Sequence, residues 1–139
     1  MNIKYIISYS GLIPFFYLII DGYFLGYLNL KFINDIAIIM SCIIFTFIGA
    51  YNWDFYRDNI VLEIYGFIPS LISMILILMN ELTYDKQFIF EILIFFLIIQ
   101  LIIDFFITMR KLFPVNYFLN LRIPVTGLLA FCLIVLSKI

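Results

Sequence analysis

Residues 100–126 read QLIIDFFITMRKLFPVNYFLNLRIPVT, and this stretch decides how the chain is arranged. It places Asp104 and three of the eight basic residues, Arg110, Lys111 and Arg122, between two long apolar runs. Apolar runs of at least about 18 residues are typical of helices that cross a bilayer. The connection LFPVNY is short enough to make the two helices antiparallel neighbours. We therefore predict a helical hairpin inside a membrane, with its basic turn near one surface.

The composition extends this prediction to the whole chain. Of its 139 residues, 66% are apolar, 12% are charged and none is histidine. A soluble domain carries about 25% charged residues, so we expect the lipid bilayer to surround this chain. The apolar runs are continuous, whereas the strands of a β-barrel would alternate in segments of about ten residues. At about 20 residues per crossing, we predict an all-α polytopic membrane protein in which residues 1–139 form one bundle of five transmembrane helices.

The predicted spans are separated by short polar segments. DGY (21–23) ends the first span, NWDFYRDN (52–59) follows the second and NELTYDKQ (80–87) follows the third. The second segment mixes Trp53, Phe55 and Tyr56 with charges, as the interfacial belt of membrane proteins does. The expected spans are Tyr5–Ile20, Phe32–Tyr51, Ile60–Met79, Phe88–Met109 and Tyr117–Ser137.

Basic residues predict the orientation of this bundle. Alternating spans place one group at the end that holds the N-terminus, namely Lys4, Arg57, Arg110, Lys111 and Arg122. The smaller group at the opposite end is Lys31, Lys86 and Lys138. Lys and Arg are in excess in cytoplasmic loops. We therefore expect the N-terminus on the cytoplasmic or matrix side and the C-terminus on the other.

Asp104 and Arg122 are charged residues inside predicted spans. Asp104 lies about 9 Å inside the end of its span, given the helical rise per residue, and Arg122 lies at a comparable depth in the next span. A charge at the centre of a span costs about 2.5–3.5 kcal/mol on insertion scales, so a partner is expected. One interpretation pairs Asp104 with Arg122, with Gln100 one turn deeper on the Asp104 face. In the other, Arg122 reaches lipid phosphates and Asp104 meets Lys111 on its own helix.

Three prolines recur at equal intervals, in GLIP, GFIP and LRIP. Pro14, Pro69 and Pro124 fall at the same phase of spans that run in the same direction. A proline lacks an amide hydrogen, so it leaves the carbonyl one helical turn earlier without its usual partner. One interpretation is a layer of helix kinks whose freed carbonyls line a cavity, or an ancestral hairpin repeat. The other is the ordinary frequency of proline in membrane helices.

Residues that carry chemistry are scarce in this sequence. The absence of histidine removes the usual haem ligand and the commonest zinc or copper ligand. The sequence contains no nucleophile elbow, phosphate loop or cysteine-ligand spacing, and Cys42 and Cys132 are expected to act as small apolar residues. We therefore expect no catalytic, cofactor-binding or metal-binding residue. The formal charge of −1 gives no reason to expect nucleic acid as a partner.

Other polar and small residues have simpler expectations. Asp35, Glu63 and Glu91 lie near the starts of their spans, where we expect water to solvate them. Gly49 and Ala50 in FIGAYNW predict close helix packing rather than a ligand site.

Several short motifs match a known family in order. GLIPF (11–15), FIGAYNW (47–53) and GFIPSL (66–71) correspond to G-L-x-P-F, F-x-G-x-x-H-W-G and G-x-x-P-S-L. The family's Q-x-x-x-D, its proline and aromatic turn, and its L-R and threonine are matched by Gln100, Asp104, Pro114, Tyr117, Leu121, Arg122 and Thr126. The chain thus resembles an uncharacterised family of small polytopic membrane proteins, found in alphaproteobacteria and mitochondria, that includes transmembrane protein 69.

This resemblance implies a place in the bacterial inner membrane or the mitochondrial inner membrane. It adds Thr126 to the candidate intramembrane polar cluster, which then consists of Gln100, Asp104, Arg122 and Thr126. It also marks a candidate interface motif, Gly49, Asn52 and Trp53. The family's histidine is Asn52 here and its following glycine is Asp54, so a role that needs an imidazole is lost or taken by an amide. The family has no established activity to transfer.

Three functions fit these observations, in order of preference. The first is a non-enzymatic accessory subunit or assembly factor of a larger membrane complex, such as a respiratory complex. The second is a small carrier or channel with a polar site between kinked helices. The third is a membrane enzyme acting on lipid, which lacks a base beside a nucleophile. The expected partners are the lipid bilayer and a larger membrane protein complex.

Overall fold

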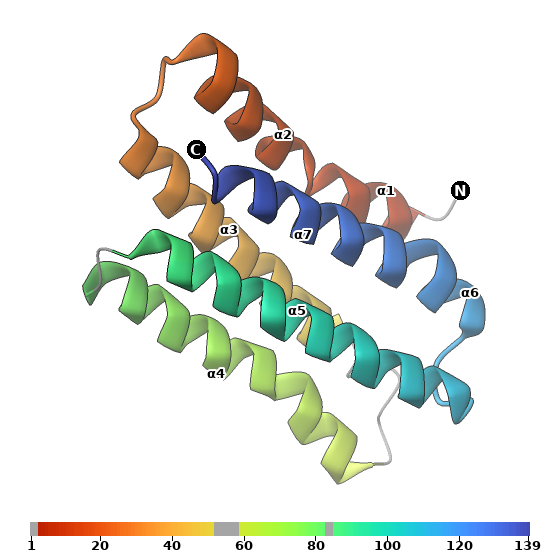
Figure 1. Cartoon of the computed structure of the whole chain (residues 1–139). Helices are drawn as coiled ribbons and strands as arrows, with labels where there is room; N and C mark the ends of the chain where they lie inside the picture. Colours follow the sequence, from red (N-terminus) through yellow and green to blue (C-terminus); the bar gives the residue numbers. More distant parts are fainter. Residues whose placement is uncertain (1–2, 52–58, 83–84) are drawn as a thin grey trace.

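The computed structural model of the chain describes residues 3–51, 59–82 and 85–139, and its regular elements there are helical (Figure 1). In this described part, five helical segments are long and apolar enough to cross a membrane. They are Tyr5–Leu25, Leu30–Tyr51, Ile60–Leu82, Lys86–Met109 and Val115–Leu136. The prediction of an all-α chain with five span-length helices is confirmed.

The first segment consists of three successive helical pieces. They are α1 (Ile3–Ser10), α2 (Ile13–Ile20) and the π-helix η1 (Asp21–Leu25). The prediction that DGY ends this span is wrong, because the buried Asp21 carboxylate accepts hydrogen bonds from the amides of Tyr27 and Leu28 at 3.3 and 2.9 Å. The helix ends instead at Gly26, which has a φ of 66°. Glycine adopts this left-handed conformation easily because it has no Cβ.

Three long helices follow, and each begins at a polar capping residue. They are α3 (Leu30–Tyr51), α4 (Ile60–Leu82) and α5 (Lys86–Met109). Asn29 accepts from the Phe32 amide at 2.8 Å, Asn59 accepts from the Val61 amide at 3.1 Å, and Asp85 accepts from the Phe88 amide at 3.1 Å. The helices are up to three residues longer than predicted, because α4 continues through Asn80 into the segment expected to be a polar loop.

The chain reverses after α5 and returns as a second composite helix. The turn places Lys111 in the left-handed region, with a φ of 61°. The returning segment consists of α6 (Val115–Tyr117), the π-helix η3 (Phe118–Arg122) and α7 (Ile123–Leu136). The hairpin predicted for residues 100–126 is therefore present, with α5 packed against α7.

The helices form a bundle with α3 and α5 at its centre (Figure 1). The outer helix α4 packs against α3 and α5, whereas α2 packs against α7 and α3. The core between them includes Phe15, Ile38, Phe45, Leu93 and Leu129, none more than 2% exposed. The two termini lie at opposite ends of the bundle, as an odd number of passes requires (Figure 1).

Candidate functional site

Asp104 of α5 and Arg122 at the end of η3 form an ion pair inside the bundle. Arg122 Nη2 donates to Asp104 Oδ2. Arg122 is 3% exposed and Asp104 is 0% exposed. The contact confirms the first of the two pairings considered for Asp104. The other is wrong, because Lys111 is exposed beyond the end of α5 and Arg122 is buried.

This burial also changes the basis of the predicted orientation. Arg122 was counted among the basic residues of the N-terminal end, but its charge is neutralised inside the protein. Arg110 and Lys111 remain exposed at that end, while Lys31 and Lys138 are exposed toward the other. Lys86 at the opposite end is likewise paired, with Asp35, so each end loses one cation and the excess at the N-terminal end is unchanged.

Tyr65 is a member of this site that sequence reasoning missed. Its hydroxyl comes from α4 and donates to Asp104 Oδ1 at 3.1 Å, and it also lies 3.4 Å from the Gln100 carbonyl oxygen. Three helical segments therefore meet at the Asp104 carboxylate. A signal was present in the sequence, because Tyr65 lies at about the same depth as Asp104 and a buried tyrosine hydroxyl needs a partner.

Gln100 and Thr126 are buried beside the ion pair but do not complete it. Gln100 lies one turn from Asp104 on α5, and Thr126 lies one turn beyond Arg122 on α7. Within the described residues, Gln100 Nε2, Arg122 Nε and Thr126 Oγ1 have no hydrogen-bond partner. The four predicted residues are thus all buried in neighbouring turns, but only two of them are shown to bond to each other through their side chains.

The three prolines have three different environments. Pro14 follows a break between α1 and α2, whereas α4 is assigned as one helix through Pro69. Pro124 follows the π-helix η3, and the carbonyl it frees, that of Asn120, accepts a 2.7 Å hydrogen bond from the Tyr9 hydroxyl. Pro14 lines the cavity described below, while Pro69 lies against Gly49. Of the three prolines, Pro14 lines this cavity and Pro69 and Pro124 do not.

Gly49 lies close against a neighbouring helix of this chain, as predicted for the small-residue pair Gly49 and Ala50. A Cβ on Gly49 would lie 2.5 Å from the Gly66 carbonyl oxygen and 2.7 Å from Pro69 Cγ. The α3 and α4 backbones approach closely at this point, as small residues allow in membrane helices. Asn52 and Trp53, the other two residues of the candidate interface motif, lie outside the described residues.

A second polar cluster lies at the opposite end of the bundle. Lys86 Nζ donates to Asp35 Oδ1 at 2.6 Å and to Asn80 Oδ1 at 2.7 Å, and Asn80 Nδ2 donates to Asp35 Oδ1 at 3.1 Å. Asp35 is partly exposed to water, as predicted, but α4 and α5 also supply partners for its carboxylate, which sequence reasoning missed. Glu63 and Glu91 are exposed, as predicted.

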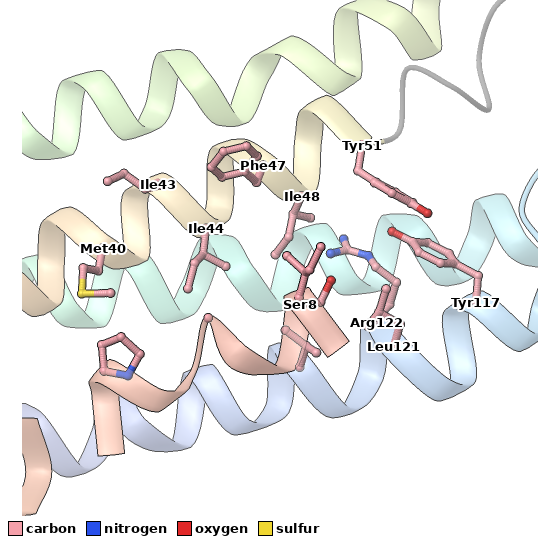
Figure 2. Close-up of a pocket in the computed structure, with 14 residues that line it drawn as sticks. Ser8, Met40, Ile43, Ile44, Phe47, Ile48, Tyr51, Tyr117, Leu121 and Arg122 are labelled. Carbon is pink, nitrogen blue, oxygen red and sulfur yellow. The ribbon is translucent and has the colours of Figure 1, made fainter. Parts of the chain in front are cut away.

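An apolar cavity of about 490 Å³ lies between the α1–α2 segment and α3, with η3 and α7 along one side (Figure 2). Along α3 it extends from Met40 to Tyr51. Its polar groups gather near one end, where Ser8, Tyr117 and Arg122 lie beside Tyr51 (Figure 2). The rings of Tyr51 and Tyr117 are stacked there, with centroids 5.1 Å apart. Arg122 therefore joins the buried ion pair to this cavity.

The two cysteines and the acidic residues do not form a metal site in the part of the chain that the structure describes. Cys42 and Cys132 are buried free thiols in the apolar core, where they were expected as small apolar residues. Among the described residues, the fold brings carboxylates and cations together in two clusters, one around Asp104 and one around Asp35. Each brings opposite charges together, which lowers the free energy of a charge within an apolar bundle.

Comparisons with protein-family models, with curated proteins and with solved structures give no match to this chain. The resemblance to the family that includes transmembrane protein 69 therefore stays a prediction from short motifs. The fold and the geometry of the polar clusters are the basis for the function proposed below.

Proposed function

We propose that the chain is an integral membrane protein that crosses the bilayer five times. This proposal is supported by the length of the five helical segments and by the apolar side chains they expose. On α4, for example, Phe67, Leu71, Met74 and Leu78 are all between 45% and 56% exposed. A soluble helix would place polar residues on such a face. Retention in the membrane pellet after alkaline carbonate extraction tests this step, and release into the supernatant contradicts it.

We further propose the bacterial inner membrane or the mitochondrial inner membrane, with the N-terminus on the cytoplasmic or matrix side. The support is the family resemblance and the exposed Arg110 and Lys111 at the N-terminal end. Single-cysteine variants Lys111→Cys and Lys138→Cys, in a chain without its two buried cysteines, test the orientation. An impermeant maleimide added from outside should label residue 138 and leave residue 111 unlabelled.

The biochemical role we propose is that of a non-enzymatic accessory subunit or assembly factor of a larger membrane complex, such as a respiratory complex. The observation that carries this role is Gly127, near the middle of the last helical segment. It is exposed, and a Cβ added to it would meet nothing within 4 Å. Packing within the chain therefore does not require a glycine, although glycine costs a helix about 1 kcal/mol relative to alanine. A small residue on an outer face is what close approach of another membrane helix requires.

The test is the size of the native complex that contains the chain after mild detergent extraction. Wild type should migrate in a large assembly, and Gly127→Leu should shift it to a small species without lowering its amount. Because the substitution removes a glycine from a helix, it should not weaken the isolated chain. Leu128→Phe adds bulk at the neighbouring exposed position and serves as the matched control. An assembly that is indifferent to Gly127→Leu contradicts the proposed contact.

The second candidate is a small carrier, favoured by the cavity beside Pro14 and Arg122. The same measurement separates the two roles, because a carrier should be extracted as a monomer or a symmetric oligomer. A stoichiometric large assembly with other proteins supports the subunit role.

A further inference from the structure

The cavity between α1–α2 and α3 has the dimensions of half a bilayer. From Met40 to Tyr51 it follows α3 for about three turns, or roughly 16 Å at the rise of an α-helix. The hydrocarbon core of a membrane is about 30 Å thick. Tyr51 is the last residue of α3, whereas Met40 lies near its middle. A molecule in this cavity would therefore reach from the surface of the bilayer to its centre.

The cavity is also polar at its surface end and apolar at its central end. Tyr51, Tyr117 and Arg122 lie near the end of α3, and Met40 lies toward its middle (Figure 2). A membrane lipid has the same change in polarity along its length, because its acyl chain lies toward the bilayer centre and its polar part lies near the surface. The rim residues Ile7, Ile43 and Phe47 are exposed, so the cavity is open to its surroundings at the side.

Arg122 supplies an unsatisfied donor at the polar end. Its side chain is buried, its Nη2 is bound to Asp104, and its Nε has no hydrogen-bond partner within the described residues. A buried donor without an acceptor is costly, so an acceptor is expected there. Because Asp104 already neutralises the guanidinium, an anion would add net charge in an apolar site, whereas an uncharged carbonyl would not. The ester carbonyl of a membrane lipid is an uncharged acceptor and fits both conditions.

We propose that this cavity binds one acyl chain of a glycerophospholipid from the surrounding bilayer, with an ester carbonyl accepting from Arg122 Nε. The stacked rings of Tyr51 and Tyr117 flank the glycerol region, and Ile44 and Gly11 contact the chain. The inference rests on the proposed insertion into a membrane. It does not depend on the proposed role as a subunit of a complex.

Native mass spectrometry of the full chain, extracted in mild detergent and washed with excess detergent, tests the proposal. Wild type should retain one phospholipid per chain. Gly11→Leu should lower the retained lipid by about tenfold or more, equivalent to about 1.4 kcal/mol of binding free energy. The Cβ of residue 11 would lie 3.4 Å from the Ser8 carbonyl oxygen and 3.9 Å from Ile44 Cδ1, so the added side chain extends toward the cavity without a severe backbone clash.

Ile44→Phe fills the cavity from the α3 side and gives an independent reading if Gly11→Leu does not fold. Gly127→Leu is the matched control, because it adds the same side chain on an outer face away from the cavity lining. It should retain lipid while it dissociates the proposed complex, and Gly11→Leu should do the opposite. The two proposals therefore fail separately.

Four results would overturn the lipid site. They are a bare wild-type chain, lipid retained undiminished by both cavity variants, a bound mass that is a free fatty acid or an isoprenoid quinone, and a bound peptide or protein in place of lipid. A phospholipid mass that both cavity variants remove and the control keeps supports it.

Discussion

The Tyr9 hydroxyl donates a 2.7 Å hydrogen bond to the carbonyl of Asn120, linking α1 to η3. In a regular helix this carbonyl would accept from residue 124, but Pro124 has no amide hydrogen. The preceding turn is a π-helix, in which the Ile123 amide donates to the Phe118 carbonyl, five residues earlier, and leaves the Asn120 carbonyl for another donor. A side chain from the first helical segment therefore completes the backbone hydrogen bonding of the last.

Replacing Tyr9 by phenylalanine removes this bond and leaves the ring in place. We expect the free energy of unfolding to fall by about 0.5–1.5 kcal/mol, measured by denaturant titration in detergent with helical content as the readout. In a Pro124→Ala background the new amide competes for the Asn120 carbonyl, so the effect of Tyr9→Phe should be smaller. Equal effects in the two backgrounds would show that the bond does not replace the missing helical one.

The Asp104–Arg122 pair predicts strong coupling between two substitutions. Asp104→Leu or Arg122→Met alone leaves an uncompensated buried group and should destabilise the protein by about 3–5 kcal/mol. The double variant removes both charges, so it should be more stable than either single variant. The measurement is the double-mutant cycle of unfolding free energies.

Two further variants complete this test. Glu91→Gln, at an exposed position on α5, should change stability by less than about 0.5 kcal/mol. Exchanging the charges (Asp104→Arg with Arg122→Asp) should restore part of the protein level that either single exchange lowers. Strictly additive effects in the cycle would mean that the pair does not stabilise the fold.

Substitution by alanine should have opposite effects on stability at Gly49, in the α3–α4 contact, and at Gly127, on the outside of α7. Gly49→Ala puts a methyl group against the Gly66 carbonyl and Pro69, so the helices must separate, at a cost of about 1–3 kcal/mol. Gly127→Ala meets open space and should stabilise the isolated chain by up to about 1 kcal/mol, through helix propensity alone. Thermal unfolding of both variants in the same detergent checks the difference. A similar effect at the two positions would refute the close approach.

The cluster of Asp35, Asn80 and Lys86 predicts that Lys86 contributes much more to stability than the exposed Lys31 does. Lys86→Met should lower stability by about 1–2 kcal/mol, because its ammonium bonds both other members and is only partly exposed. Lys31→Met, at an exposed position near the start of α3, should have little effect. Unfolding free energies at the same ionic strength give the comparison, and an equal loss in the two variants would place the stabilisation elsewhere.

The extent of the helices was largely predictable, because length and continuous apolar composition are local properties of the sequence. The errors occurred at their ends. The sequence predicts Asp21 in a turn, but its carboxylate accepts hydrogen bonds from the amides of Tyr27 and Leu28, beyond the end of the helix. The sequence predicts Asn80 in a loop, but it lies in α4 and bonds Asp35 of another helix. In both cases a polar residue stays within a helix because a partner satisfies its side chain.

The candidate site was predictable only in part. The depth of Asp104 and Arg122 in successive spans allowed two pairings, and neither helix periodicity nor charge could choose between them. Tyr65, the third participant, comes from a helix far away in the sequence. The cavity was not predictable, because its lining comes from α1, α2, α3, α6, η3 and α7 together.

The sequence by itself determined the number of long apolar helices, the short connections between them and the need of the charged residues for partners. These follow from the free energy of apolar and charged groups in a low-dielectric environment, which depends on each segment alone. Only the tertiary structure decided which charges meet, which glycine lies against a neighbouring helix and which one faces outward. Those outcomes depend on the rotation and spacing of whole helices, since a turn of a helix about its axis changes every partner while its apolar composition stays the same.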